Sequence, residues 1–554
     1  MTNNKRLYVG LTKSPEFFSD VYSYFMRGGY YAILIENILH IITTGSTLAF
    51  ITFVTFCVDW NSIGRCQSED TCNNFSEYVI YPKHFHTTFT VACMIMFIIV
   101  FSIYWVITLL TLVKESVRYL RIRNYFKNIG IRTDEIKVLT WLDVVKNMIE
   151  NDNDLNPEII VGSVMNKDNY LIAMVGSSAF NIDEAYYTKV FLWVINVVVL
   201  NQIFSQPNNK KISVDTHAVS NMIKILAVAQ IILCPFTFTL TIVHSIINVT
   251  TDIYTGNSYL GPKEWTTHAR LSFREYNELP HIFDIRINKS YEHAGKYEQK
   301  FSAHIMNMLM KRIIFTLGTF LTLLVFLTFY NETLVLYIKL FNRSLIWYIT
   351  ILVTLITVCR MAIVDTTSIN ESAEEIMEKI AEHTHYFPEC WKGKCHKCDI
   401  LEKYKTLFTY KLVNILYELI SIFYIPYYML YKMPDDLEKI ALFIEGNTKY
   451  CEGIGHICSA GLSTNLNVFS TYDGDYASYE LLIEDEKIKR SLANFNNYYS
   501  STMLQEGKKE IYTIHEEQTA EIEEMMGNND IDEPLLSAST VEMSMLKSGE
   551  SDTF

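Results

Sequence analysis

The residues best suited to coordination chemistry lie in EHTHYFPECWKGKCHKCD, residues 382–399. Cys395 and Cys398 have the C-x-x-C spacing of zinc ligands, and zinc takes four ligands of this kind. Further ligands in the same segment are His383, His385, Cys390 and His396. No second C-x-x-C accompanies the first, and reduced surface thiols with packing histidines are the alternative interpretation. We therefore expect no resident metal and no other cofactor.

Three common catalytic motifs are missing. The sequence has no G-x-x-x-x-G-K-[ST] phosphate loop, no H-E-x-x-H and no G-x-S-x-G. These motifs mark nucleotide-driven proteins, metalloproteases and serine hydrolases, respectively. The segment GNSYLG, residues 256–261, misses the hydrolase spacing by one residue. The sequence therefore predicts neither an ATP-driven pump nor an enzyme with covalent chemistry.

Long uncharged stretches indicate what must position the polar residues. They cover residues 37–58, 88–113, 313–330 and 345–364, the last of these interrupted only by Arg360 near its end. A helix crosses a hydrocarbon core of about 30 Å with roughly 20 residues. We therefore predict a mostly α, polytopic membrane protein with four transmembrane helices.

The basic residues predict the orientation of these helices. Seven lysines and arginines lie in residues 114–137, whereas the loop 59–87 has only Arg65 and Lys83. Cytosolic flanks carry excess Lys and Arg, so we expect a lumenal 59–87 loop and cytosolic termini. The same loop contains a glycosylation sequon at Asn74 and two cysteines in an oxidising compartment, a candidate disulfide. Those cysteines are Cys66 and Cys72.

Two further apolar segments contain a proline. They are residues 225–251 with Pro235, and residues 412–431 with Glu418 and Pro426. If 225–251 spanned the membrane, the nine basic residues of 252–312 would become lumenal, against the charge rule. Proline removes a helical hydrogen bond and permits a break. We therefore predict two re-entrant hairpins with breaks at the prolines; buried helices of a soluble domain are the alternative.

These expectations divide the whole chain. The apolar run at 190–204 is too short to span and is expected to pack in the cytosolic domain. The predicted regions are a cytosolic N-terminal segment (1–36), transmembrane helices 1 and 2 with their loop (37–113), a cytosolic region (114–224), the first re-entrant segment (225–251), a cytosolic region (252–312), transmembrane helices 3 and 4 (313–364), a cytosolic region (365–411), the second re-entrant segment (412–431), a cytosolic end of the core (432–500) and a disordered acidic tail (501–554).

The tail carries much of the charge. Residues 511–554 hold eleven acidic residues and one lysine, while the whole chain has a net charge of −14. The body is therefore near neutral, which argues against nucleic-acid binding. Two short patterns fit sorting signals for vesicle adaptors, although such patterns often arise by chance. One is tyrosine-based, at Tyr8 and Leu11; the other is an acidic dileucine, at Asp532, Leu535 and Leu536.

A resemblance emerges from several blocks in register. WTTHARLSFREYNELPHIFDIRINKSYEHAGKY (265–297) resembles the signature region of the autophagy-related protein 9 family. Further similar blocks are YSYFMRGGYYAILIENILHIITTGSTLAF (22–50), LTWLDVV (139–145), NKDNYLIAM (166–174), EHTHYFPECWKG (382–393), YKLVNILYELISIFYIPYYML (410–430) and GIGHICSAG (453–461). The three cysteines at 390, 395 and 398 are not part of the family pattern, which weakens a general zinc function.

The resemblance implies a homotrimer with exchanged helices and ATP-independent phospholipid scrambling in autophagosome formation. It also implies a bridge-like lipid-transfer protein as partner, and Golgi- or endosome-derived vesicles and the preautophagosomal membrane as location. The alternatives are an ion channel or solute transporter, and a non-catalytic scaffold that recruits autophagy proteins.

A scramblase must give the charged lipid headgroup a polar path through the bilayer. The candidate path residues are Arg270, Arg274, Glu275, Asn277, Glu278, His281 and Glu418. Basic side chains there suit phosphate, and carboxylates suit choline or ethanolamine. The alternative interpretation is an ion-paired brace that holds the cytosolic domain together.

Overall fold

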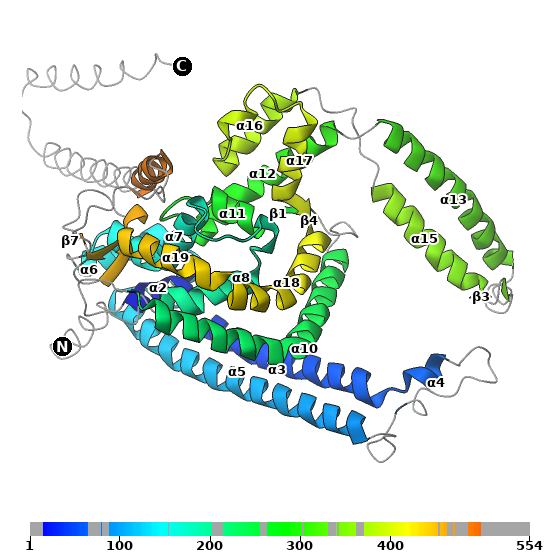
Figure 1. The fold of residues 1–554 in the computed structure, drawn as a ribbon, viewed down its shortest axis with the longest axis horizontal. Coiled ribbons are helices and arrows are strands. Elements are labelled where there is room, and N and C mark those ends of the chain that lie inside the picture. Colours follow the sequence, from blue (N-terminus) through cyan, green and yellow to red (C-terminus); the bar gives the residue numbers. More distant parts are fainter. Residues whose placement is uncertain are drawn as a thin grey trace, which may run out of the picture. The chain divides into compact units, whose positions relative to one another are not determined.

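The computed structural model describes residues 15–64, 79, 88–152, 155–201, 214–254, 263–301, 304–330, 339–340, 343–361, 371–451, 455–461, 469–470 and 486–499. The chain divides into two compact units, Met1–Leu492 and Ala493–Phe554; all contacts below lie within the first. Among the described residues helices predominate and strands are short, as the sequence predicts (Figure 1).

The first two predicted membrane segments are confirmed as long apolar helices. They are α3 (Tyr30–Thr52), continued by the π-helix η1 (Phe53–Cys57), and α5 (Thr88–Asn128). Leu48, Ile51 and Phe101 are buried where the helices meet. Apolar side chains such as Ile42 and Ile103 remain exposed. Such an outer surface is what lipid contact requires.

The helix α10 (Thr216–Tyr254) packs against this pair through its phenylalanines. Phe236 is buried with the α3–α5 core and stacks on Phe97, with 5.2 Å between ring centroids. Pro235 lies inside α10, and the ribbon bends along its course (Figure 1). Since the helix continues on both sides of the proline, the expected break is corrected to a bend.

The second proline segment also forms one continuous helix. α18 (Lys411–Tyr431) includes Pro426 and packs along α10. Its neighbours bury Ile425, Pro426 and Tyr428. Packing on α10 keeps the chain helical through the proline, so the predicted break at Pro426 is also corrected.

The third and fourth predicted segments form a helical pair. They are α13 (His304–Tyr330) and α15 (Leu345–Met361), which pack on each other. Between them the strands β2 (Lys339–Leu340) and β3 (Arg343–Ser344) pair antiparallel. Phe315, Phe326 and Phe329 of α13 are exposed. Residues 362–364 of the predicted fourth span lie outside the described residues.

Length and composition do not separate spanning from re-entrant helices here. Within the described residues, five helices are long and apolar enough to cross a membrane, and they lie in α3 with η1, α5, α10, α13 and α18. α15 contributes a shorter apolar stretch, Leu345–Thr357. The assignment of α10 and α18 as re-entrant rests on flanking charge and stays a prediction.

A first hydrophobic core surrounds α7. Its helices are α2 (Pro15–Met26), α6 (Trp141–Asn151), α7 (Pro157–Gly176), α8 (Lys189–Val194), the π-helix η7 (Ile195–Leu200) and α19 (Met433–Gly446). A capping box between Thr140 and Asp143 starts α6, and the side chain of Asn156 caps α7. Phe191 and Val198 are fully buried, which confirms that the run beginning at residue 190 packs in this core.

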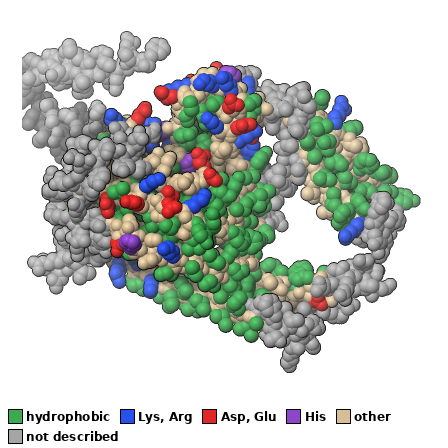
Figure 2. All heavy atoms as spheres, viewed as in Figure 1, with side chains coloured by type: hydrophobic (Ala, Val, Ile, Leu, Met, Phe, Trp, Pro, Cys, Tyr) green, Lys and Arg blue, Asp and Glu red, His purple; other side chains and the backbone are tan. Residues whose placement is uncertain are grey.

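A second core lies around Trp265. Its elements are β1 (Lys263–Trp265), α11 (Thr267–Phe273), α12 (Pro280–Lys300), α16 (Ala373–Thr384), α17 (Cys398–Leu407) and β4 (Phe408–Tyr410). β1 and β4 pair antiparallel, with Trp265 opposite Phe408. Charged side chains gather over α16 and α17, whereas hydrophobic ones gather over α10 and α5 (Figure 2).

The last described residues, 486–499, form a helix. The remaining elements of the described chain are short. They are α4 (Trp60–Gly64), the 3-10 turns η5 (Glu135–Lys137), η6 (Glu184–Tyr186), η9 (Glu389–Trp391) and η10 (Ser459–Gly461), and the strands β5 (Thr448–Cys451), β6 (Gly455–Cys458) and β7 (Phe469–Ser470). The last three strands form one sheet in the order β6-β5-β7.

Candidate functional site

The turn between α11 and α12 holds most of the predicted path residues. The Thr266 side chain caps α11, which ends at Phe273, and Pro280 occupies the first turn of α12. Between them Asn277 has a left-handed φ of 57°. Asn tolerates this conformation better than most residues, because its short side chain can hydrogen-bond locally. The sequence therefore folds residues 274–279 into a tight turn between the two helices.

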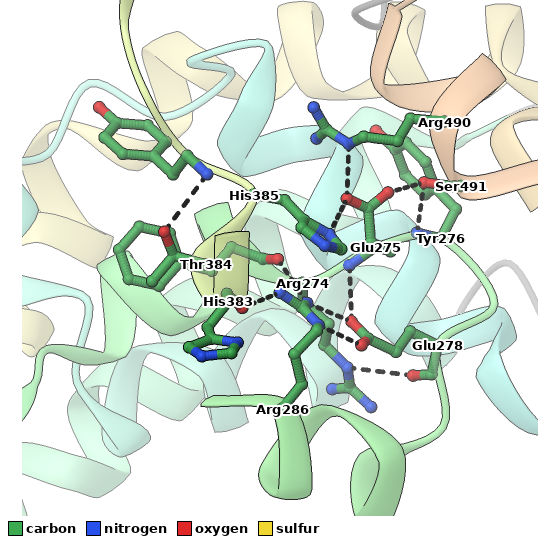
Figure 3. Close-up of polar contacts among 12 residues, drawn as sticks. Arg274, Glu275, Tyr276, Glu278, Arg286, His383, Thr384, His385, Arg490 and Ser491 are labelled. Atoms are coloured by element: carbon green, nitrogen blue, oxygen red, sulfur yellow. Dashed lines mark hydrogen bonds and ion pairs between the residues drawn. The ribbon is translucent and has the colours of Figure 1, made fainter. Parts of the chain in front are cut away.

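Glu275 sits at the centre of a buried polar cluster (Figure 3). Its side chain is 4% exposed and accepts from Arg490 Nε at 2.8 Å. The Nδ1 atom of His385 lies 2.9 Å from the same carboxylate, and the Ser491 hydroxyl donates to its other oxygen. One carboxylate thus connects the turn to two segments that are distant in sequence.

These partners determine the ionisation of Glu275. Burial alone raises the pKa of a carboxyl group. The hydrogen bonds from His385 and Ser491, together with the charge and hydrogen bond of Arg490, outweigh burial and lower the pKa of Glu275 to about 2. Glu275 is therefore a carboxylate at physiological pH and is saturated by protein donors.

Glu278 forms a second cross-link. Arg286 of α12 donates to both of its carboxylate oxygens, each at 2.7 Å. The same guanidinium donates to the carbonyl oxygens of His383 and of Phe273. This bidentate pair fixes α12 to the end of α11 and to the end of α16. We call Glu275, Glu278, Arg286, His385, Arg490 and Ser491 the brace (Figure 3).

Asn277 and His281 are also engaged by the protein. Asn277 Nδ2 donates to the Gly461 carbonyl at 2.6 Å, and its amide oxygen accepts from Asn169 at 2.8 Å. Nδ1 of His281 lies 2.8 Å from the Tyr22 hydroxyl. Burial lowers the pKa of His281, which favours the neutral ring. Four of the predicted path residues, Glu275, Asn277, Glu278 and His281, thus make polar contacts within the protein, as the alternative interpretation predicts; a place for them on the lipid path stays a prediction.

The other three predicted residues meet in one cavity. Arg270, Arg274 and Glu418 line a space of about 390 Å³ beside the turn. The full lining is Lys189, Leu192, Glu264, Trp265, Thr267, Arg270, Leu271, Arg274, Pro280, Phe283, Asp284, Tyr291, Asn414 and Glu418. It lies at the N-terminal end of α18, where this apolar helix leaves the β1–β4 ladder. Polar groups therefore converge at the foot of a helix predicted to enter the bilayer.

Two of the three cations in the cavity, Arg270 and Lys189, are in solvent-exposed ion pairs. Arg270 Nη2 lies 2.6 Å from Asp284, and the two side chains are 37% and 53% exposed. Lys189 Nζ lies 3.5 Å from Glu418, with the lysine side chain 83% exposed. Exposed pairs of this kind are worth little, about 0–1 kcal/mol, so a competing charge can replace either partner.

Arg274 links the cavity to the first core. Its Nη2 atom lies 3.1 Å from Asp168 of α7, and the side chain is 13% exposed. At the opposite wall, Asn414 Nδ2 donates to Glu264 at 2.9 Å. Three basic and three acidic side chains therefore face one space with no excess charge of either sign.

Several residues of the cavity and of the brace were not predicted from the sequence. In the cavity these are Lys189, Glu264, Asp284 and Asn414; in the brace they are Arg286, Arg490 and Ser491. The proline at the start of α12 does signal a helix whose first two turns follow the motif, which would have identified Asp284 and Arg286. Nothing local in the sequence connects Lys189 or Arg490 to this turn.

The cysteine and histidine candidates do not converge. Within the described residues, no group of three or more His, Cys, Asp or Glu could hold a metal ion. Cys395 is buried, and Cys398 is exposed. Burial, together with a hydrogen bond to the Glu374 carboxylate and its charge, raises the pKa of Cys395 to about 12. A zinc ligand must be a thiolate, so this environment opposes binding.

Other predicted sites fall outside the described residues. They are the sequon at Asn74, the cysteines Cys66 and Cys72, and the sorting patterns at Tyr8, Leu11, Asp532, Leu535 and Leu536.

Comparison with known proteins gives one consistent family. The family model described as "Autophagy protein ATG9" matches residues 12–462. Proteins named Autophagy-related protein 9 from Dictyostelium discoideum, Saccharomyces cerevisiae and Arabidopsis thaliana are each 26% identical, over 86%, 82% and 80% of this chain. The matched regions span 71%, 48% and 56% of those proteins, so the chain spans about half the length of the yeast and plant relatives.

A solved structure has a similar fold. The cryo-EM structure of Schizosaccharomyces pombe Atg9 superposes with a TM-score of 0.59 at 23% identity. The match covers 81% of this chain and 98% of that one.

Proposed function

This chain belongs to the autophagy protein ATG9 family, and from that premise we propose that it is a phospholipid scramblase acting in autophagosome formation. A scramblase lets lipids run down their own gradient between leaflets, so it needs a polar path and no ATP. The observation that carries the proposal is the cavity at the foot of α18. It offers charged groups of both signs beside an apolar helix.

The cavity chemistry matches a zwitterionic phospholipid headgroup. Arg270, Arg274 and Lys189 can bind the phosphate, and carboxylates such as Glu418 can bind the amine. Because the exposed pairs are weak, a headgroup can exchange places with Asp284 or Glu418 at little cost. The acyl chains meanwhile stay against the exposed apolar surfaces of α10 and α18.

Family membership also leads us to propose the assembly and the setting. We propose a homotrimer, with both termini cytosolic, in Golgi- or endosome-derived vesicles and the preautophagosomal membrane. A bridge-like lipid-transfer protein would deliver lipid to one leaflet, and vesicle adaptors would bind the terminal sorting patterns. The exposed apolar surface of the α13–α15 pair supports contact with lipid or with another copy.

A liposome assay tests the proposal. Purified full-length protein is reconstituted with a fluorescent phospholipid, and dithionite bleaches the outer leaflet. A scramblase lets bleaching pass well beyond half of the signal, whereas protein-free liposomes stop near half. A parallel ion-flux measurement separates scrambling from a channel, and bleaching that stops near half would leave a scaffold role.

A further inference from the structure

The start of the 486–499 helix contacts the turn through an unusual concentration of polar groups. Lys487 Nζ donates to the Ser272 carbonyl at 2.8 Å and lies 5.7 Å from the centre of the Tyr276 ring. Lys487 is only 7% exposed. Arg490 and Ser491 both donate to Glu275. The helix that makes this contact lies beyond residue 462, where the match to the family model ends.

Ser491 is the centre of this contact. It is 3% exposed, and its oxygen accepts from the Tyr276 backbone N–H at 3.1 Å while its hydroxyl donates to Glu275 (Figure 3). The hydroxyl thus uses its donor and one acceptor position within a closed space. Any added group on this oxygen would displace the Glu275 carboxylate.

Polar bonds rather than apolar burial hold residues 486–492 to the turn. Ile488 is only partly buried against the first core, and the contacts to 272–276 described above are hydrogen bonds, one ion pair and the approach of Lys487 to the Tyr276 ring. Water solvates all of these groups when the helix is undocked, so the net stability of the contact is much smaller than the sum of its bonds. A single added charge can therefore decide whether the contact forms.

We propose that residues 486–492 form a releasable latch on residues 272–276, which are the end of α11 and the start of the turn, and that phosphorylation of Ser491 holds this latch open. Phosphorylation transfers the terminal phosphoryl group of ATP to the Ser491 oxygen, releasing ADP and the hydroxyl proton. The product adds a charge of about −1.5 to −2 beside the carboxylate of Glu275. Arg490 and His385, the nearby cationic or protonatable partners, are already bonded to that carboxylate.

The sequence before Ser491 suits a basic-directed serine kinase. Lys487, Lys489 and Arg490 precede it within four residues. Since Ser491 is buried when docked, the kinase acts on the undocked helix, and the phosphate then prevents docking. Release would free the turn that carries Arg274, so its effect on lipid movement rests on the proposed function; the latch itself does not.

Hydrogen–deuterium exchange of the full-length protein tests the latch. We expect Ser491→Asp to raise amide exchange roughly tenfold or more in residues 486–492 and 272–276, since it places an acid against Glu275. The matched control Asn494→Asp adds the same charge at an exposed position and should exchange like the wild type. Wild-type exchange in Ser491→Asp would overturn the proposal.

Direct phosphorylation provides an independent test on the unmodified sequence. A basic-directed serine kinase with ATP should incorporate phosphate at Ser491 of the folded wild-type protein, and exchange in both segments should then rise. Incorporation should be quicker in Glu275→Gln, which removes the charge that Arg490 and Ser491 contact and keeps the basic residues before Ser491. No incorporation at Ser491 even in Glu275→Gln would overturn the proposal. Lipid flipping measured on the same samples tests the proposed function separately, because amide exchange measures docking of the helix whether or not the protein moves lipid.

Discussion

The brace and the cavity both take charged residues from one short segment of sequence, residues 270–286, but these residues are paired differently in the two places. Glu275 and Glu278 have side chains that are 4% and 9% exposed, and protein donors surround them. Arg270, on the preceding helix, is 37% exposed and pairs with an even more exposed Asp284. A saturated buried ion pair fixes geometry, whereas a loose exposed pair can exchange its partner for a ligand. Charge in a motif therefore does not by itself identify a binding residue.

The largest expected effect is on stability, at the centre of the brace. Replacing Glu275 by Gln removes the charge that His385, Arg490 and Ser491 solvate. We expect the free energy of unfolding to fall by about 3 kcal/mol, measured by pulse proteolysis in detergent. Lipid flipping per folded molecule should stay near the wild-type rate. A variant that is stable but flips slowly would place Glu275 on the lipid path instead.

The acid response should be nearly as large. Glu275 has a pKa of about 2 when folded and an ordinary value of 4.5. Its stabilising contribution is complete above pH 4.5 and is lost as the pH falls towards 2, a total of about 3 kcal/mol. The stability difference between wild type and Glu275→Gln should therefore shrink from pH 6 to pH 3. A difference that stays constant over this range would contradict the assigned pKa.

A smaller loss is expected where the turn meets η10. A Cβ added at Gly461 would lie 2.6 Å from Asn169 Nδ2 and 3.0 Å from Asn277 Oδ1. Because both atoms belong to the amide pair that fixes the turn, Gly461→Ala should cost about 2 kcal/mol of unfolding free energy. Gly446→Ala, where an added Cβ meets nothing within 4 Å, is the matched control. Equal stability of the two variants would contradict the packing described here.

The smallest stability effect should come from the cavity. Lys189 is 83% exposed and 3.5 Å from Glu418, so Lys189→Gln should change the free energy of unfolding by less than about 0.5 kcal/mol. The same thermal or proteolytic assay measures this change. A loss comparable to that of Glu275→Gln would make the Lys189–Glu418 pair part of the brace.

The sequence predicted the apolar helices well, because hydrophobic runs of membrane length are local signals. The first predicted run lies almost entirely in α3 with η1, and α5 and α13 contain the second and third. The prolines were interpreted too strongly: Pro235 and Pro426 remain inside continuous helices, since packing between α10 and α18 supports the backbone there. Local pattern cannot report that support.

The site was predictable only in part, for a related reason. Charged residues in one short block were identified, and Arg270, Arg274 and Glu418 do share a cavity. Their division into brace and cavity depends on partners far along the chain. Arg490 is 215 residues from Glu275, for example, and no local spacing reveals that contact.

The central claim is that the cavity, and not the brace, carries the headgroup. The most direct measurement is dithionite-detected flipping in liposomes by Lys189→Gln/Arg270→Gln/Arg274→Gln, beside the exposed triple control Lys296→Gln/Lys379→Gln/Lys392→Gln. Loss of the phosphate contacts should slow flipping roughly tenfold or more, with the control at the wild-type rate. A folded cavity variant that flips lipid as fast as the control would contradict the account.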